Sequence, residues 1–270
     1  DPGSRLGNYA LVTNNGALTV TAAPLLVKAS NTNKVYRTLL AFAGGEFTIL
    51  SGALLNGNTL TNVSLSSPGT PKGAKVGTYP ITAGAAQGNG LTNYSITYSN
   101  GTLTVAPTNL TITANNAIKT YGASLALPSN GFTTSDMEPG DSVTNVSLST
   151  AGADGTAPAG NYPIIPGNAT GIGLTNYTIE YSNGTLTVGL ANLSVAALDT
   201  NKTYGELLLP LGFTVAGLLN LDSVTNVNLA SAGGPAGAAV GNYPIIPGAA
   251  AGVGLTNYTI NYSNGELTVN

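Results

Sequence analysis

A fifteen-residue segment that recurs three times constrains the fold of this chain more than any other feature. The segment from Leu91 to Val105 returns almost unchanged from Leu174 to Val188 and from Leu255 to Val269. Successive copies are 83 and 81 residues apart, counted on the first tyrosine of each segment. A copy of this length can bury a small core of its own. The sequence therefore predicts a tandem array of small modules.

Other motifs recur in step with this segment and place the boundaries of the copies. They begin at Lys34, Lys119 and Lys202, at Thr61, Thr144 and Thr225, and at Gly77, Gly160 and Gly241. We expect module 1 at residues 21–105, module 2 at 106–188 and module 3 at 189–270, with residues 1–20 as the tail of a preceding copy. The predicted joints are only a few residues long, which holds neighbouring modules close and favours an elongated array.

The repeated segment has the pattern of a closing β-hairpin. Asn183 and Gly184 form the dipeptide most typical of a two-residue type I′ turn, because both residues tolerate a positive φ. Such a turn pairs Tyr181 with Leu186 and sets both on one hydrophobic face, since directly opposed residues share a face. The pattern predicts a one-sided sheet with its own core in each module.

The remaining patterns indicate short strands and little helix. Pro163 lies within a strand pattern, which favours an edge strand because proline cannot donate to a β-ladder. Weak helical signals at residues 135–138 and 216–220 predict one or two helical turns, each before a strand. The sequence therefore predicts a mainly β chain, of α+β type if those short turns form.

Charged residues are unusually sparse, and this excludes some partners. They make up 7% of the chain, against about 25% in typical soluble domains. Hydrophobic residues reach 42%, so cores can form beneath a neutral polar surface. Nucleic-acid surfaces need clustered Lys and Arg, whereas the 8 basic residues here are spread along the chain. No apolar run reaches the roughly 18 residues of a membrane span, so we expect neither nucleic acid nor a membrane segment.

Missing residue types exclude several kinds of active site. The chain has no histidine and no cysteine, which removes histidine-dependent nucleophiles and cysteine-based zinc sites. The tightest acidic cluster, Asp136, Glu138 and Asp141, could serve as a carboxylate pair, but module 3 keeps only Asp222 of it. The side-chain oxygens of Asn115 and Asn116 suit calcium, but Asx turns explain these two residues equally well. We therefore expect no enzyme activity, no catalytic residue, no cofactor and no metal site.

Two residue types recur in every copy and are the candidates for a site. The tyrosines beside proline are Tyr79, Tyr162 and Tyr243, and the recurring lysines are Lys34, Lys119 and Lys202. The tyrosines are candidate glycan ligands, with packing as the alternative. The lysines are candidates for an isopeptide cross-link to an asparagine side chain, with a lysine stem covering a tyrosine ring as the alternative.

The order of these motifs resembles a known family. The motifs are the Lys-Thr-Tyr-Gly run from Lys119 to Gly122, the Gly-Asn-Tyr-Pro-Ile run from Gly160 to Ile164, and the repeated closing segment. Together they resemble the MBG-type repeat domains (YGX type) of large secreted bacterial adhesins, over residues 21–269. Module 1 departs from the pattern, with Arg37 in place of the glycine.

The resemblance implies both a fold and a function. It implies β-grasp-like modules with a mixed sheet and at most one short helix each; immunoglobulin-like β-sandwich modules are the alternative. It also implies a stalk or spacer in a filamentous-haemagglutinin-like, two-partner-secreted adhesin, which presents a distal binding region and supports adhesion or biofilm cohesion. The expected location is secreted or on the bacterial cell surface. A glycan-binding module and a self-associating filament segment are the alternatives, with polysaccharide or neighbouring adhesin chains as partners.

Overall fold

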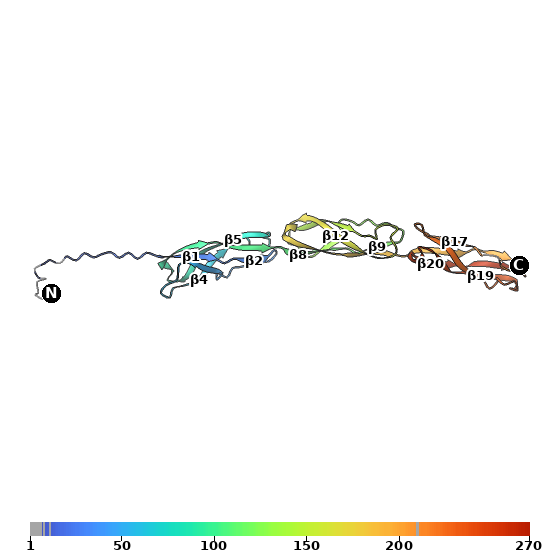
Figure 1. Ribbon diagram of the computed structural model, residues 1–270, viewed down its shortest axis with the longest axis horizontal. Coiled ribbons are helices and arrows are strands. Elements are labelled where there is room, and N and C mark those ends of the chain that lie inside the picture. The colour runs from blue at the N-terminus through green and yellow to red at the C-terminus, as the bar shows by residue number, and fades with distance from the viewer. Residues whose placement is uncertain (1–6, 8, 11, 209–210) are drawn as a thin grey trace. The chain divides into compact units, whose positions relative to one another are not determined.

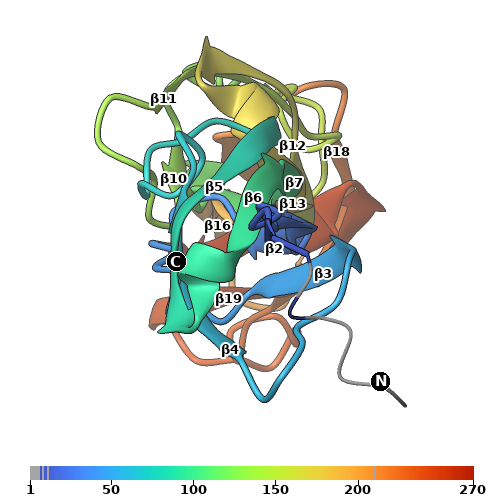
Figure 2. The same ribbon diagram turned by 90° about the vertical axis from the view of Figure 1, so that its left-hand side faces the viewer.

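The computed structural model describes residues 7, 9, 10, 12–208 and 211–270. The chain divides into two compact units, residues 1–108 with module 1 and residues 109–270 with modules 2 and 3. Figures 1 and 2 show strands and loops in every module, and the described residues contain no α-helix. No helix among them is long and apolar enough to cross a membrane. The predicted mainly β class is confirmed.

Module 1 consists of two small sheets and one short 3-10 turn. Its elements are β1 (Ala23–Ala29), β2 (Thr32–Val35), β3 (Phe47–Ser51), β4 (Thr59–Ser66), β5 (Gly77–Asn89), η2 (Leu91–Asn93), β6 (Tyr94–Ser99) and β7 (Gly101–Ala106). One sheet has the order β3-β1-β6 and the other has the order β2-β7-β5-β4. The pairs β1–β6 and β2–β7 are parallel and the remaining pairs are antiparallel.

Modules 2 and 3 repeat this arrangement strand for strand. Module 2 has β8 (Thr108–Ala114), β9 (Ala117–Thr120), β10 (Phe132–Thr134), β11 (Ser142–Ser149), β12 (Gly160–Ile172), η3 (Leu174–Asn176), β13 (Tyr177–Ser182) and β14 (Gly184–Gly189). Module 3 has β15 (Ala191–Ala197), β16 (Thr200–Lys202), β17 (Phe213–Ala216), β18 (Ser223–Ala230), β19 (Gly241–Val253), η4 (Leu255–Asn257), β20 (Tyr258–Ser263) and β21 (Gly265–Val269). The sheets are β10-β8-β13 with β11-β12-β14-β9, and β17-β15-β20 with β16-β21-β19-β18.

The core of each module lies between its two sheets. In module 1, Leu25 and Val27 of β1 pack with Val63 of β4 and Tyr94 of β6. The three aliphatic side chains are at most 1% exposed. Alternate residues along β1 point into this core, as the two-residue period of a strand requires. A second sheet, rather than a helix, therefore covers each three-stranded sheet.

The predicted closing hairpin is wrong. β13 joins the sheet of β8, whereas β14 pairs with β12 and β9 in the other sheet. Leu186 is buried but Tyr181 is 42% exposed, so the two side chains do not share a face. Gly184 has no positive φ; instead, an added Cβ would lie 2.5 Å from the Ala114 carbonyl oxygen. The glycine is needed for close backbone approach where the chain crosses between sheets.

The predicted helical turns and the edge strand also need correction. Residues 135–138 and 217–219 are irregular, and 3-10 turns occur instead at η2, η3 and η4, each directly before a strand. β12 is an inner strand, paired with β11 and β14. Pro163 nevertheless lies opposite Thr185 of β14, and the register with β11 reaches only to Ile165. At Pro163, β12 is therefore paired with β14 only and has no partner on the side of β11. A proline is tolerated there because it lacks an amide proton to donate on that side.

Candidate functional site

The joint between modules 2 and 3 combines polar and aromatic contacts. The Tyr121 hydroxyl, just after β9, donates to Asp222 Oδ2 at 2.8 Å. The Tyr258 hydroxyl, at the start of β20, donates to the same oxygen at 2.8 Å. The two rings meet edge to face, with centroids 5.5 Å apart and planes at 83°. One carboxylate oxygen from module 3 therefore links tyrosines from both modules.

Further contacts across the joint involve the backbone. Asn220 Nδ2 donates to the Gly155 carbonyl at 3.3 Å, and the Ala159 amide donates to Asn257 Oδ1 at 2.9 Å. Asn257 is 7% exposed, so its polar side chain is buried by this contact. Both Tyr121 and Tyr258 belong to a core cluster that also contains Ile164 and Leu193, from modules 2 and 3. The two modules thus share buried apolar surface as well as hydrogen bonds.

Glycines on both sides of the joint allow this close packing. Gly122 has φ +88°, and an added Cβ would lie 2.4 Å from Leu219 Cδ1 of module 3. Gly254 has φ +75°, and an added Cβ would lie 1.8 Å from Asp222 Oδ1. Glycine is favoured at both positions because other residues resist a positive φ. The two glycines therefore allow Leu219 to approach Gly122 and Asp222 to approach Gly254.

Burial and the carboxylate together suppress ionisation of the two tyrosines. Burial, the largest cause, and the hydrogen bond to Asp222 together raise the pKa of Tyr258 from 10.0 to about 12. Burial is also the largest reason why the pKa of Tyr121 is raised, with Asp222 adding to it and the side chains of Asn220 and Asn257 opposing it. A buried phenolate beside a carboxylate is unfavourable because it loses solvation and meets a like charge.

We expect unit 2 to keep its stability up to about pH 10 and to lose part of it between about pH 10 and pH 12. The folded-state pKa of Tyr258 lies above its ordinary value of 10.0, so the contribution is present below that value and disappears as pH rises through the folded one. Urea unfolding at about pH 8 and about pH 11 measures the difference. Asp222→Asn should reduce it, and an equal free energy of unfolding at both pH values would contradict the expectation.

The acceptor half of this joint recurs in the other modules. In module 1 the Leu55 amide donates to Tyr94 Oη at 2.6 Å, and Asn58 Nδ2 donates to the same oxygen at 3.3 Å. In module 2 the Tyr177 hydroxyl donates to Asp141 Oδ2 at 2.9 Å, and the Glu138 amide donates to that hydroxyl at 2.9 Å.

The acidic cluster considered from the sequence therefore contributes a tyrosine partner, Asp141. Asp136 and Asp141 also line an open hollow of about 610 Å³ beside β10. Among the described residues, no group of three acidic side chains is arranged to hold a metal ion.

The recurring lysines lie buried in a cage of backbone carbonyls. Lys34 Nζ donates to Thr38 O at 2.8 Å, to Thr70 O at 3.2 Å and to Pro71 O. Lys202 Nζ donates to Glu206 O at 3.0 Å and to two carbonyls of the loop before β19. Lys119 makes the equivalent three bonds. Each ammonium ties two loops together through all three of its donors, which accounts for a recurring lysine in a chain with so few charges.

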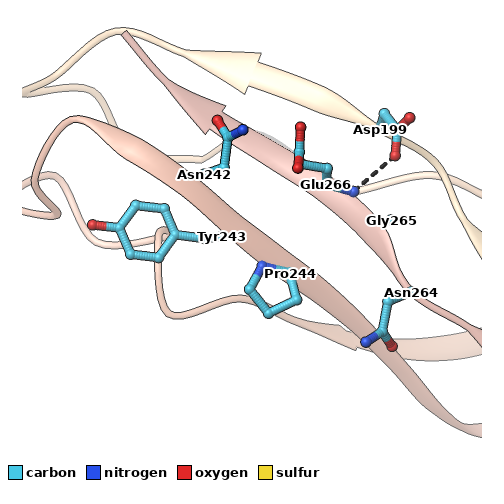
Figure 3. A pocket seen from close by; sticks show the side chains of 7 residues that line it. All are labelled: Asp199, Asn242, Tyr243, Pro244, Asn264, Gly265 and Glu266. Carbon is cyan, nitrogen blue, oxygen red and sulfur yellow. Dashed lines mark hydrogen bonds between the residues drawn. The ribbon is translucent and has the colours of Figure 1, made fainter.

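The recurring tyrosines pack at the edge of each core. The Tyr243 hydroxyl donates to Ala239 O at 2.9 Å, and an added Cβ on Gly233 would lie 2.7 Å from its ring. Tyr79 and Tyr162 make the same bond and approach an equivalent glycine. Figure 3 shows Tyr243 beside a hollow of about 360 Å³, with Asn242 on the other side of β19. The Glu266 amide there donates to Asp199 Oδ1 at 2.7 Å.

Sequence reasoning missed the joint, although its residues carried a signal. Tyr121 and Tyr258 both belong to motifs that recur in every copy. In the sequence, Asp222 resembles the remnant of an acidic cluster, because its partners are distant: Tyr121 lies 101 residues away and Tyr258 lies 36 residues away. A recurring tyrosine opposite a recurring Asp or Asn was the available clue.

Comparisons with known proteins agree with the module count. Residues 25–104, 110–187 and 193–268 each match the family described as MBG domain (YGX type). No curated protein matches the chain. Among solved structures, Drosophila N-cadherin EC1–4 is similar at 8% identity and a TM-score of 0.28, covering 92% of this chain and 73% of that one. The I9–I11 tandem of titin is similar at 12% identity and a TM-score of 0.23, covering 90% and 97%. These TM-scores carry no argument about function, whereas the three family matches span most of the sequence, so this chain belongs to the MBG domain (YGX type) family.

Proposed function

We propose that this chain is a spacer segment of a secreted or cell-surface bacterial adhesin, in which docked modules hold a distal binding region. The observation that carries the proposal is the joint between modules 2 and 3. A freely jointed array would leave module ends solvated, but here Tyr121 is 5% exposed and Tyr258 is 6% exposed. A shared buried surface resists bending between neighbours, which is what a spacer requires.

The chemistry of the chain supports the same proposal. The recurring lysines and tyrosines are used to hold loops and core edges in place. The surface is polar but nearly uncharged, with 8 basic and 11 acidic residues in 270. Such a surface offers little electrostatic attraction to other macromolecules. The family resemblance adds two features to this proposal: export by two-partner secretion and a role in biofilm cohesion.

Spin-label distance measurements test the rigid joint. The chain has no cysteine, so Ser147→Cys and Asn228→Cys place one label on β11 and one on β18, both at exposed positions. We expect a single narrow distance distribution between the labels, because the joint fixes module 2 against module 3. Adding Tyr121→Ala should broaden the distribution. A distribution that is already broad without this substitution would overturn the proposal of a rigid spacer.

Glycan binding is the alternative hypothesis. The hollow beside Tyr243 combines an aromatic edge with the polar side chains of Asn242 and Glu266. Retention of the chain on immobilised polysaccharide, lost on Tyr243→Ala, would support this alternative.

A further inference from the structure

The first and last strand segments of a module lie side by side and run in the same direction. In module 3, β15 pairs in parallel with β20, and β16, which follows β15, pairs in parallel with β21. Module 1 has both parallel pairs, as β1–β6 and β2–β7, and module 2 has the parallel pair β9–β14. The chain therefore enters and leaves a module along two neighbouring, parallel segments.

The two segments keep one register where they step from one sheet to the other. In module 3, Ala191 of β15 lies opposite Tyr258 and Lys202 of β16 lies opposite Val269, so the paired residues are 67 positions apart in both sheets. In module 1 the separation is 71 positions in both sheets. An extra residue bulged out of either segment would change this separation. Each of these modules therefore holds a single parallel ladder that runs through both of its sheets.

A side chain ties the two segments at the step between the sheets. In module 3, Asp199 lies between β15 and β16, and its Oδ1 accepts from the Glu266 amide of β21 at 2.7 Å (Figure 3). Asn31 and Asn116 accept in the same way in modules 1 and 2, at 2.9 Å and 2.8 Å. An added Cβ on Gly265, at the start of β21, would lie 2.8 Å from the last carbonyl oxygen of β15. The segments thus stay in close contact through the step.

We propose that this ladder, with its tie at the step, is a mechanical clamp through which each module bears tension along the chain. Tension pulls the first segment toward its amino end and the last segment toward its carboxyl end. Because the segments are parallel neighbours, the two pulls are opposed along one line and slide one segment past the other. The hydrogen bonds between the segments are then loaded together. Each bond is weak by itself, so loading them together raises the force that unfolding needs.

Successive clamps follow one another with almost no intervening chain. β14 ends at Gly189 and β15 begins at Ala191, so Leu190 alone separates the last segment of module 2 from the first segment of module 3. Tension that leaves one clamp therefore enters the next one directly. The inference deepens the proposed function and rests on it, because a spacer that holds a binding region carries the load when that region is attached.

Pulling single molecules in two directions tests the clamp in module 3. The chain has no cysteine, so handles can be attached through Asn192→Cys on β15 and Asn270→Cys after β21, and pulling between them shears the ladder. In the comparison chain the second handle moves to Thr259→Cys, directly opposite Asn192, so that β15 and β20 are peeled apart from one end. All three positions are exposed. At one loading rate, we expect the unfolding force in shear to be at least about twice the force in peeling.

Substitution of Asp199 tests whether the tie belongs to the clamp. Asp199→Ala removes the acceptor for the Glu266 amide and should lower the unfolding force in shear. Asp199→Asn keeps an acceptor oxygen and is the matched control. Equal forces in the two pulling directions, or equal shear forces for these two variants, would overturn the proposal. The spin labels report on the joint between modules 2 and 3, whereas the handles load module 3 alone, so failure of the clamp and failure of the rigid spacer are distinguishable.

Discussion

Replacing Lys34 by methionine should destabilise module 1 by about 3 kcal/mol. The ammonium is buried, at 8% exposure, and donates to the carbonyls of Thr38, Thr70 and Pro71. Methionine fills a similar volume but has no donor, so these carbonyls lose a charged partner within the fold. Leaving buried acceptors unsatisfied is the costly part, because in the unfolded chain water would satisfy them. Urea unfolding of the Lys34→Met variant and of the unsubstituted chain gives the difference in the free energy of unfolding.

Lys75→Met is the matched control for this prediction. Lys75 lies in the same module with an exposed side chain, and only its backbone carbonyl is used, by Tyr79. The substitution should change the free energy of unfolding by less than about 0.5 kcal/mol. Equal effects of the two substitutions would show that the cage around Lys34 does not stabilise the module. The equivalent substitutions of Lys119 and Lys202 should act alike on modules 2 and 3.

Tyr121→Ala should destabilise unit 2 by about 3 kcal/mol and uncouple modules 2 and 3. The substitution empties a site that is 5% exposed, removes the bond to Asp222 and removes the edge-to-face contact with Tyr258. In tandem proteins the interface between neighbours makes them unfold together. We therefore expect one unfolding transition of unit 2 to split into two in the variant, as calorimetry would record.

Tyr204→Ala supplies the control, because the same motif stands in module 3 with its ring 60% exposed. It should change the free energy of unfolding of unit 2 by less than about 0.5 kcal/mol. A loss comparable to that of Tyr121→Ala would mean that the tyrosine stabilises its own module, and the joint would then not explain the effect.

The short-range part of the fold was readable because strand side chains alternate. The pattern around Leu186 and Val188 identified β14 and its buried face, since both residues are at most 2% exposed. The partner of that strand could not be read. Asn183 and Gly184 favour a tight turn locally, but β14 pairs with β9 and β12, which lie far away in sequence. Burial between two sheets outweighed the local turn preference.

The candidate residues show the same division. Their recurrence marked Lys34, Lys119 and Lys202 as significant, but the acceptors of Lys34 at residues 70 and 71 lie 36 and 37 positions away. Only the folded chain brings those carbonyls to one ammonium. The recurrence of Asp or Asn at the position of Asp222 does not reveal its role, because that role depends on tyrosines from two different modules.

By itself, the sequence determined that this protein consists of three copies of one small β-module, because a repeated pattern of alternating residues specifies the same strands each time. The tertiary structure decided how those strands divide between two sheets. It also decided that Tyr121 is buried against Asp222, a residue 101 positions away in the chain. The physical reason is that burial and hydrogen bonding depend on which groups approach in space, and the residues concerned lie tens of positions apart in the chain.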